Sequence, residues 1–309
     1  MKKILVFIII SLCVISLMFL IFISNKNRNT GSKSGSAKIQ VTASFYPLYY
    51  LASEIGGNKI SIYNMTPSSS EPHDYEPTTQ DISRIEKSNL LIINGNVESW
   101  GNKIKDNLKG TNVRIIVAGD GLFTKQYTEE GKTSSDPHLW LSPQLAKKEA
   151  QKITEEFVRL DPLNSLYYQT NEKTLADRLD ALDNNYKKGL SDCKQKDIIT
   201  SHAAFAYLAS TYGLNQVSIS GLSPDSEPSA QQLAEVVRFA KEHKVKYIFF
   251  ESLVSPKLSE TIASEIGAKT LVLNPLEGLS DDEIKQGKNY FTVMADNLKN
   301  LQKALECNI

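Results

Sequence analysis

The stretch NSLYYQTNEKTLADRLDALDNNYKKGL, residues 164–190, decides the architecture of the chain. It holds no proline, and its one glycine is Gly189 near the end, so little in it would interrupt a helix. Its apolar residues recur at helical spacing, and they are Leu166, Tyr167, Leu175, Leu179, Leu182 and Tyr186. At about 1.5 Å per residue this helix would span roughly 40 Å, which is longer than a small domain is wide. It is either a core helix of one domain or a rigid backbone between two lobes.

Strand and helix patterns alternate on both sides of this stretch. Strands are expected at 39–44, 59–65, 90–94 and 113–117 before it, and at 198–200, 216–220, 246–251 and 270–273 after it. Helices are expected at 47–55, 79–88, 100–108 and 143–160 before it, from Ala203, Ser229 and Pro256 after it, and at 289–307. Such alternation is typical of crossover units and mainly parallel sheets.

Because a second series of strands and helices follows residue 190, we favour the backbone role. The expected fold class is α/β, with two Rossmann-like lobes of mainly parallel sheets joined by one long backbone helix. The expected domains are an N-terminal segment with a tether (1–37), an N-terminal lobe (38–163), the linking helix (164–193) and a C-terminal lobe (194–309).

Residues 1–37 carry the signal for the cellular compartment. Residues 4–23 hold no charge, and about 20 apolar residues cross the core of a bilayer. The run is longer than that of a usual secretory signal and no small-residue cleavage site follows closely, so we expect an uncleaved signal-anchor. Export after cleavage is the alternative, and lipid attachment at Cys13 is a weaker one. Residues 24–37 would form a flexible tether, which places the folded part outside the cytoplasm and anchored to the membrane.

The charge of the chain argues against one class of partner. Lys and Arg number 35 against 35 Asp and Glu, but residues 1–37 hold five of the basic residues and no acid. Removing those five leaves 30 basic residues against 35 acidic ones, a net charge of −5. No basic stripe with interleaved aromatic residues is present, which argues against nucleic acid. A mild negative excess suits cation capture, but it is also ordinary for a soluble domain.

Two cysteines, Cys193 and Cys307, lie in the remainder of the chain. Outside the cytoplasm such a pair can persist as a disulfide, which would join the last helix to the start of the second lobe. Two buried thiols are the alternative. Neither cysteine has C-x-x-C spacing, which argues against a redox role or a cysteine-type zinc site.

Three of the four histidines lie in contexts that suit metal binding. They are His73 in EPHD, His138 in DPHLW and His202 in TSH. Imidazole is the commonest neutral ligand for a cation such as Zn²⁺. The prolines before His73 and His138 restrict the backbone and lower the entropy lost when the ring binds a metal. His202 follows an expected strand, at the end where open α/β sheets bind ligands. His243, in KEHK near a helix end, is expected to be solvated.

Carboxylates accompany these histidines. Glu277 follows the last expected strand, so it can converge with them as a ligand. Asp136 and Glu71 would either orient an imidazole through its other ring nitrogen or cap a turn. Glu251 ends an apolar strand, and it is expected to orient a ligand or to lie between the lobes rather than to bind the metal.

Several motifs in this order resemble the zinc-type solute-binding proteins of bacterial ABC metal importers, the cluster A-I family. The motifs are SFYP (44–47), EPHDYEPT (71–78), DPHLWLSP (136–143), SHAAF (201–205) and FE (250–251). The resemblance covers essentially all of residues 38–309. It implies two α/β lobes bridged by one long helix, with one Zn²⁺ per chain at their interface. The ligands carried onto matching positions are His73, His138, His202 and Glu277.

The resemblance also bears on the choice of metal. Manganese-type relatives usually carry glutamate where His202 stands and aspartate where Glu277 stands. Three nitrogen donors and one oxygen favour zinc, and an Mn²⁺- or Fe²⁺-binding member is the alternative. Many zinc members have a histidine-rich loop before the second ligand, whereas residues 119–135 have none.

The implied function is not enzymatic. The chain is expected to bind Zn²⁺ with high affinity outside the cytoplasm, as a monomer, and to deliver it to an ABC permease and its ATPase. A zinc hydrolase is the rival class, with Glu251 or Asp74 as the base, but no HExxH or GxSxG motif is present. An adhesin that uses zinc structurally is a third candidate, because members of the family that the chain resembles can act both in metal transport and in adhesion.

Overall fold

The computed structural model describes Met18, residues 38–129 and residues 131–308. The expected signal-anchor and tether lie outside these residues, apart from Met18. Within the part of the chain that is described, no helix is long and apolar enough to cross a membrane. Lys38–Ile309 form one compact unit, and the description below concerns that unit.

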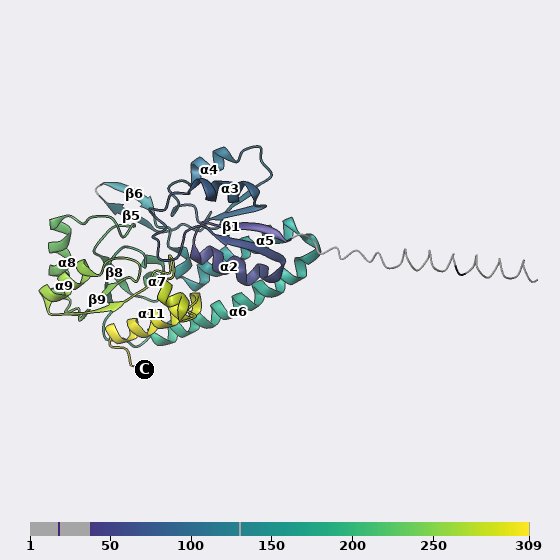
Figure 1. Cartoon of the computed structure of the whole chain (residues 1–309). Helices are drawn as coiled ribbons and strands as arrows, with labels where there is room; N and C mark the ends of the chain where they lie inside the picture. The colour runs from purple at the N-terminus through teal and green to yellow at the C-terminus, as the bar shows by residue number, and fades with distance from the viewer. Residues whose placement is uncertain (1–17, 19–37, 130, 309) are drawn as a thin grey trace, which may run out of the picture. The chain divides into compact units, whose positions relative to one another are not determined.

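Two four-stranded parallel sheets form the framework (Figure 1). The N-terminal sheet has the order β2-β1-β3-β4, and its strands are β1 (Ile39–Ala43), β2 (Ile60–Asn64), β3 (Leu90–Ile93) and β4 (Arg114–Val117). The C-terminal sheet has the order β10-β9-β7-β8, and its strands are β7 (Asp197–Thr200), β8 (Asn215–Ser218), β9 (Tyr247–Phe250) and β10 (Lys269–Val272). This confirms the α/β class and the mainly parallel sheets.

Helices connect and cover the strands. In the first half they are α2 (Tyr46–Gly56), α3 (Thr79–Lys87), α4 (Gly101–Asn107) and α5 (Pro143–Leu160), with short 3₁₀ turns η1 (Gly57–Lys59), η2 (Leu139–Leu141) and η3 (Pro162–Asn164). In the second half they are α7 (Ala206–Thr211), α8 (Ala230–Glu242), α9 (Lys257–Ile266), α10 (Asp281–Lys285) and α11 (Tyr290–Ala304). Local sequence sets several starts: Thr78 caps α3 together with Asp81, and Pro143 occupies the first turn of α5.

The long helix is α6 (Ser165–Gly189), which runs along one side of the molecule in Figure 1. It begins just after Pro162 and ends at Gly189, as the uninterrupted pattern predicts. Leu175, Leu179 and Leu182 are buried on its inner face, which packs against α5, α2 and α11. Leu166 is 75% exposed, whereas Tyr168 in the same turn is buried, because Leu166 lies nine residues before Leu175 and so points to the opposite side of the helix.

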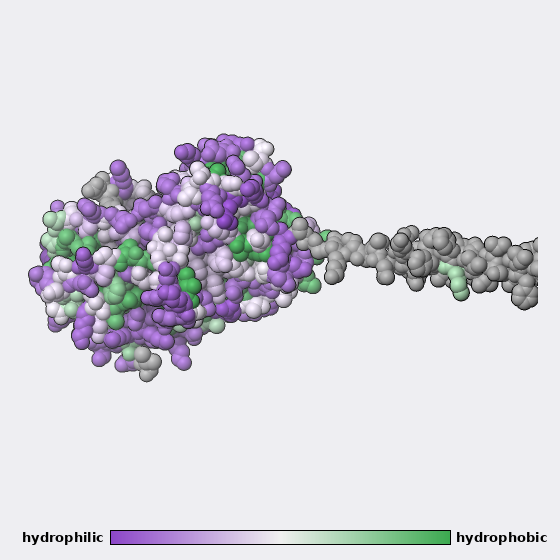
Figure 2. Space-filling view, in the orientation of Figure 1, coloured by the Kyte–Doolittle hydropathy of each residue, from purple (hydrophilic) through white to green (hydrophobic). Residues whose placement is uncertain are grey.

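The hydrophobic core is continuous between the two sheets. The largest buried cluster contains Phe45 and Trp140 from the first half and Phe249, Leu276 and Tyr290 from the second. On the face seen in Figure 2, the apolar residues lie in small separate patches among hydrophilic ones. The two halves are therefore held by buried side chains as well as by α6.

Three features depart from the expectation, and the unexpected helix α10 is one of them. Residues 119–136 contain a hairpin of β5 (Gln126–Glu129) and β6 (Lys132–Ser135), with Gly131 at a φ of 76° in its turn. Its strands are polar, so the apolar alternation that marks a strand is missing. The helix expected from Ala203 begins at Ala206 instead, since the backbone N–H of Ala203 donates to the Gly221 carbonyl at 2.8 Å.

Cys193 and Cys307 are joined by a disulfide. The bridge links the segment after α6 to the segment after α11 and closes a loop with a sequence separation of 114. It therefore joins the end of the long helix directly to the end of the chain.

Glu149 on α5 is a buried carboxyl whose replacement is expected to stabilise the protein. It is 0% exposed, and neither of its oxygens has a hydrogen-bond partner among the described residues. Burial, opposed by Lys152 and reinforced by Glu98, raises the pKa of Glu149 from 4.5 to about 8. Between these values the unfolded chain loses its proton while the folded one keeps it, so stability falls as the pH rises.

Glu149→Gln removes this ionisation, and it should raise the free energy of unfolding at pH 7 by about 3 kcal/mol. Near pH 4.5 the same variant should change it little, because both states are then largely protonated. Urea unfolding at the two pH values measures the difference, and Glu155→Gln, at an exposed position of α5, serves as the control. A gain that is equal at both pH values would show that ionisation of Glu149 is not the cause.

Candidate metal centre

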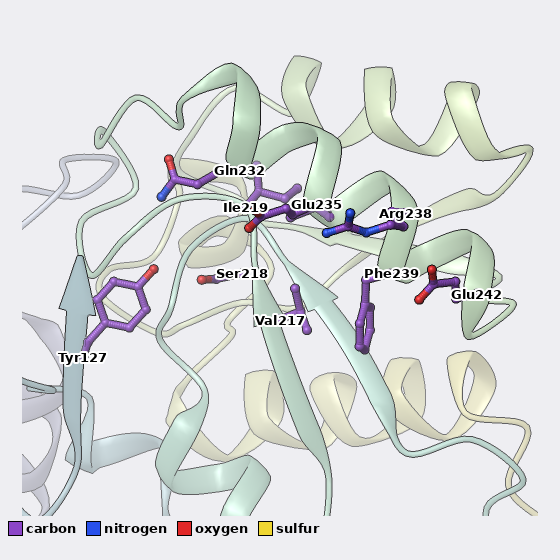
Figure 3. A pocket seen from close by; sticks show the side chains of 10 residues that line it. Tyr127, Val217, Ser218, Ile219, Gln232, Glu235, Arg238, Phe239 and Glu242 are labelled. Carbon is purple, nitrogen blue, oxygen red and sulfur yellow. The ribbon is translucent and has the colours of Figure 1, made fainter. Parts of the chain in front are cut away.

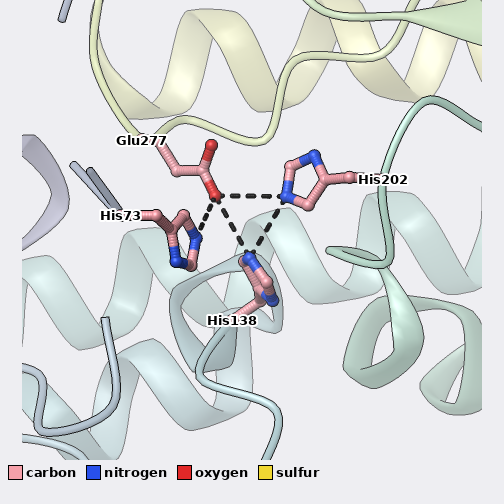
Figure 4. Close-up of side chains that lie close together, drawn as sticks. All are labelled: His73, His138, His202 and Glu277. Carbon is pink, nitrogen blue, oxygen red and sulfur yellow. Dashed lines mark hydrogen bonds and ion pairs between the residues drawn. The ribbon is translucent and has the colours of Figure 1, made fainter. Parts of the chain in front are cut away.

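Four side chains from separate loops converge between the two sheets (Figure 4). His73 lies in the loop after β2, and His138 directly precedes η2. His202 follows β7, and Glu277 follows β10. One donor atom from each of the four lies within 4.8 Å of the others, and they form the one such group of His, Cys, Asp and Glu found among the described residues.

Most of the distances between the donor atoms match those of a tetrahedral site. Oε1 of Glu277 lies 3.1 Å from Nε2 of His73, 3.1 Å from Nε2 of His138 and 3.3 Å from Nε2 of His202. The Nε2 atoms of His138 and His202 are 3.3 Å apart. Zinc–ligand bonds of about 2.0–2.1 Å in a tetrahedron require roughly 3.3 Å between donors. Four of the six distances between donor atoms therefore match a tetrahedral zinc site, and all four donors lie within 4.8 Å of one another.

Carboxylates contact two of the histidine rings at Nδ1, the ring nitrogen that faces away from the centre. Nδ1 of His138 lies 2.7 Å from Oδ1 of Asp136, and Nδ1 of His202 lies 2.6 Å from Oε1 of Glu251. Glu251 also accepts a hydrogen bond from Ser201. A proton on Nδ1 leaves the lone pair of Nε2 directed at the centre, which is how such carboxylates tune metal-binding histidines.

Glu71 acts on the backbone instead. Its Oε1 accepts a hydrogen bond from the backbone N–H of His73 at 3.1 Å, so of the two roles expected for Glu71, the contact matches the turn cap. Burial and the nearby charge of Glu277 raise the pKa of Glu71 to about 10. The pKa of Glu277 is lowered instead, so Glu277 provides the negative charge at the centre.

The site is largely buried, with His73 at its more exposed side, and its charged groups shift one another's pKa values. His138 and His202 are 0% exposed and Glu277 is 1% exposed. Burial alone would raise the pKa of Glu277, but the charge of His202 and hydrogen bonds to the three rings lower this pKa well below its usual value. Burial opposes a proton on His202, yet Glu251 and Glu277 raise its pKa well above the usual value. A divalent cation bound here would replace that proton, because ligand nitrogens must be deprotonated.

Trp140 is a contributor that the sequence reasoning passed over. Its indole N–H donates to the carbonyl of Pro275 at 2.8 Å, and its own carbonyl accepts from the hydroxyl of Tyr290 at 2.5 Å. These bonds fix the turn after His138 against the loop that carries Glu277. The sequence signal that could have indicated this role is the position of the tryptophan, two residues after the candidate ligand His138.

The remaining candidates lie elsewhere. His243 is at the end of α8, half exposed, with its Nδ1 2.8 Å from Asp197, in agreement with the solvated position expected for it.

A hollow of about 380 Å³ lies between Tyr127 of the hairpin, β8 and α8, and its lining includes Arg238 and Phe239 but no histidine or cysteine (Figure 3). It offers no comparable set of metal donors.

Two parallel sheets, a long helix and a buried three-histidine, one-carboxylate centre together define a zinc-binding solute-binding protein of an uptake system. Comparison with known sequences agrees, because the model of the family "Zinc-uptake complex component A periplasmic" matches residues 41–304. The chain belongs to this family. The resemblance seen in the sequence is thereby confirmed, and so is the non-enzymatic class.

Individual relatives are similar over most of the chain. The high-affinity zinc uptake system protein ZnuA of Bacillus subtilis is 40% identical over 308 residues, which cover 95% of this chain and 97% of the relative. The zinc-binding protein AdcA of Streptococcus pyogenes serotype M1 is 37% identical over 86% of this chain, which spans only 56% of AdcA. A Streptococcus pneumoniae relative, 38% identical over 309 residues, is described as the zinc-binding lipoprotein AdcA.

Solved structures show the same fold. The Zn(II)-bound ZnuA-like domain of Streptococcus pneumoniae AdcA superposes with a TM-score of 0.77 at 39% identity, covering 87% of this chain and 100% of that one. The laminin-binding protein Lmb of Streptococcus agalactiae, described as bifunctional with adhesin and metal-transporting activity, has a TM-score of 0.78 at 32% identity. The coverage in that case is 87% of this chain and 99% of Lmb.

Proposed function

We propose that the chain captures one Zn²⁺ per molecule outside the cytoplasm and delivers it to the permease and ATPase of an ABC importer. The observation that carries this proposal is the largely buried centre of His73, His138, His202 and Glu277, in which four of the six donor distances match a tetrahedral zinc site. Zinc is the cargo here and takes part in no reaction. Membership of the zinc-uptake family supports the transport role.

The proposed mechanism divides the chain into an N-terminal lobe (38–163), a linking helix (164–193) and a C-terminal lobe (194–309). The first lobe supplies two of the rings, and the second supplies His202 and Glu277. The ion would therefore stabilise the closed arrangement, because only there are all four donors within reach. The continuous core and α6 favour a small opening movement over a wide hinge.

We propose zinc as the physiological metal over Mn²⁺ and Fe²⁺. Three imidazole nitrogens with one carboxylate oxygen suit zinc, whereas manganese prefers more oxygen donors. We also propose that the chain acts as a monomer anchored to the membrane through residues 1–37. The adhesin role described for Lmb supports a second candidate, attachment to an extracellular protein.

The test uses residues 38–309 without a histidine tag, since these form a compact unit. The protein is exposed to equal concentrations of zinc and manganese, washed, and analysed for metals by mass spectrometry. We expect one zinc per chain. The full chain should also restore zinc uptake to cells that lack their own binding protein. Preferential retention of manganese would contradict the proposal. So would cells that gain binding to laminin from the full chain but do not regain zinc uptake.

A further inference from the structure

The geometry points to Tyr207 as a positioning residue that fastens the hairpin and Asp136 to the C-terminal half and thereby slows the release of zinc. This inference rests on the proposed function, and it names the contact that governs how long the ion stays bound. It concerns a side chain that touches none of the four donors.

The hydroxyl of Tyr207 connects two distant parts of the chain. Tyr207 lies on α7 and is 3% exposed. Its oxygen accepts hydrogen bonds from the backbone N–H groups of Thr124 and Lys125, both at 3.1 Å. The same hydroxyl donates to the carbonyl of Asp136 at 3.2 Å. One hydroxyl therefore satisfies three backbone groups, which flank the hairpin on both sides.

These contacts lead directly to a donor of the centre. The backbone N–H of Asp136 donates to the Lys125 carbonyl at 3.0 Å, which closes the base of the hairpin. The side chain of Asp136 holds Nδ1 of His138 at 2.7 Å. On the other side, α7 begins shortly after His202. The hydroxyl thus ties the segment that orients His138 to the helix that follows His202.

The hairpin has little else to hold it in place. β5 and β6 form a separate two-stranded sheet and pair with neither four-stranded sheet. Gln126, Thr128 and Lys132 are exposed, and Tyr127 borders the hollow beside β8 (Figure 3). Few buried contacts oppose local opening of such an element, so each buried hydrogen bond at its base counts.

Tyr207→Phe removes the hydroxyl and keeps the ring. It leaves two N–H groups and one carbonyl without this partner in the closed form, whereas water can reach them when the halves separate. The closed, zinc-bound form is then destabilised relative to the open one. We expect the zinc dissociation rate to rise by roughly tenfold to a hundredfold, with the association rate unchanged.

Tyr212→Phe is the matched control. Its hydroxyl donates to the carboxylate of Asp183 at 2.9 Å, and among the described residues no hydrogen bond joins it to the hairpin. Both variants lose one tyrosine hydroxyl next to the same short helix. Tyr212→Phe should therefore lower the melting temperature of the metal-free protein while changing the zinc dissociation rate by less than about twofold.

Two measurements on the full chain decide the matter. Chelator competition in a stopped-flow instrument gives the dissociation rate, and hydrogen exchange of the metal-free protein reports on the amides of Thr124 and Lys125. We expect faster release and faster exchange in Tyr207→Phe only. Equal release from Tyr207→Phe and Tyr212→Phe would overturn the inference, and so would unchanged exchange at Thr124 and Lys125. Failure of the unaltered protein to bind zinc would instead refute the proposed function. The hydrogen-exchange result would still show whether the Tyr207 hydroxyl holds the base of the hairpin.

Discussion

Glu277→Gln is expected to weaken zinc binding on the order of a thousandfold, because it removes the negatively charged ligand that lies next to all three histidine rings. Oε1 of Glu277 lies within 3.3 Å of Nε2 in all three rings. No water can replace the carboxylate easily, since the residue is 1% exposed. Affinity is measured by competition with a chelator of known strength at pH 7.

His243→Ala is the control for this experiment, because His243 is the histidine that lies outside the centre. It should leave the affinity unchanged. Metal-free Glu277→Gln should lose some stability, because the buried carboxylate is paired with the rings, so a far-ultraviolet circular dichroism spectrum that matches the unaltered protein at the assay temperature separates lost coordination from lost folding. A drop in affinity smaller than about tenfold would show that Glu277 is not a ligand.

Replacing both Cys193 and Cys307 with serine is expected to lower the free energy of unfolding by about 4–5 kcal/mol. The bridge closes a loop with a sequence separation of 114, so its loss restores much conformational freedom to the unfolded chain. Urea unfolding of the metal-free protein under oxidising conditions measures the change. Adding a reductant to the unaltered protein should bring its stability toward that of the double variant.

Asn308→Ala serves as the local control for the bridge. The side chain of Asn308 donates to Asp192 at 2.9 Å beside the disulfide, so this variant disturbs the same corner without opening the loop. It should cost less than about 1 kcal/mol. If the two variants proved equally destabilising, the covalent link would contribute nothing beyond its neighbouring contacts.

Much of the fold could be predicted because local signals were strong. The long helix was expected at 164–190 and is observed at Ser165–Gly189, since Pro162 and Gly189 mark its ends and no breaker lies between. The hairpin was missed because its pairing depends on partners rather than on apolar alternation, as with the facing hydroxyls of Thr128 and Thr133. α10 was missed although Ser280 and Glu283 form a capping box that the sequence displays.

The candidate site could be predicted in composition but not in geometry. Prolines before His73 and His138 and the strand-end position of His202 suggested ligands one at a time. Their distances follow from the arrangement of two sheets, which no local pattern encodes. Tyr207 gave no signal either, because a tyrosine on the apolar side of a helix looks like an ordinary core residue.

The shared core between the two sheets has a kinetic consequence. Phe45 and Trp140 pack in one cluster with Leu276 and Tyr290, so most of the contact between the two halves does not depend on the ion, and a small movement completes the cage. A preorganised cage loses little entropy on capture, and differences in affinity between related binders reside mainly in the escape rate. In the proposed role, release of the zinc ion is then the slow step, and the importer would use ATP hydrolysis to separate the two halves.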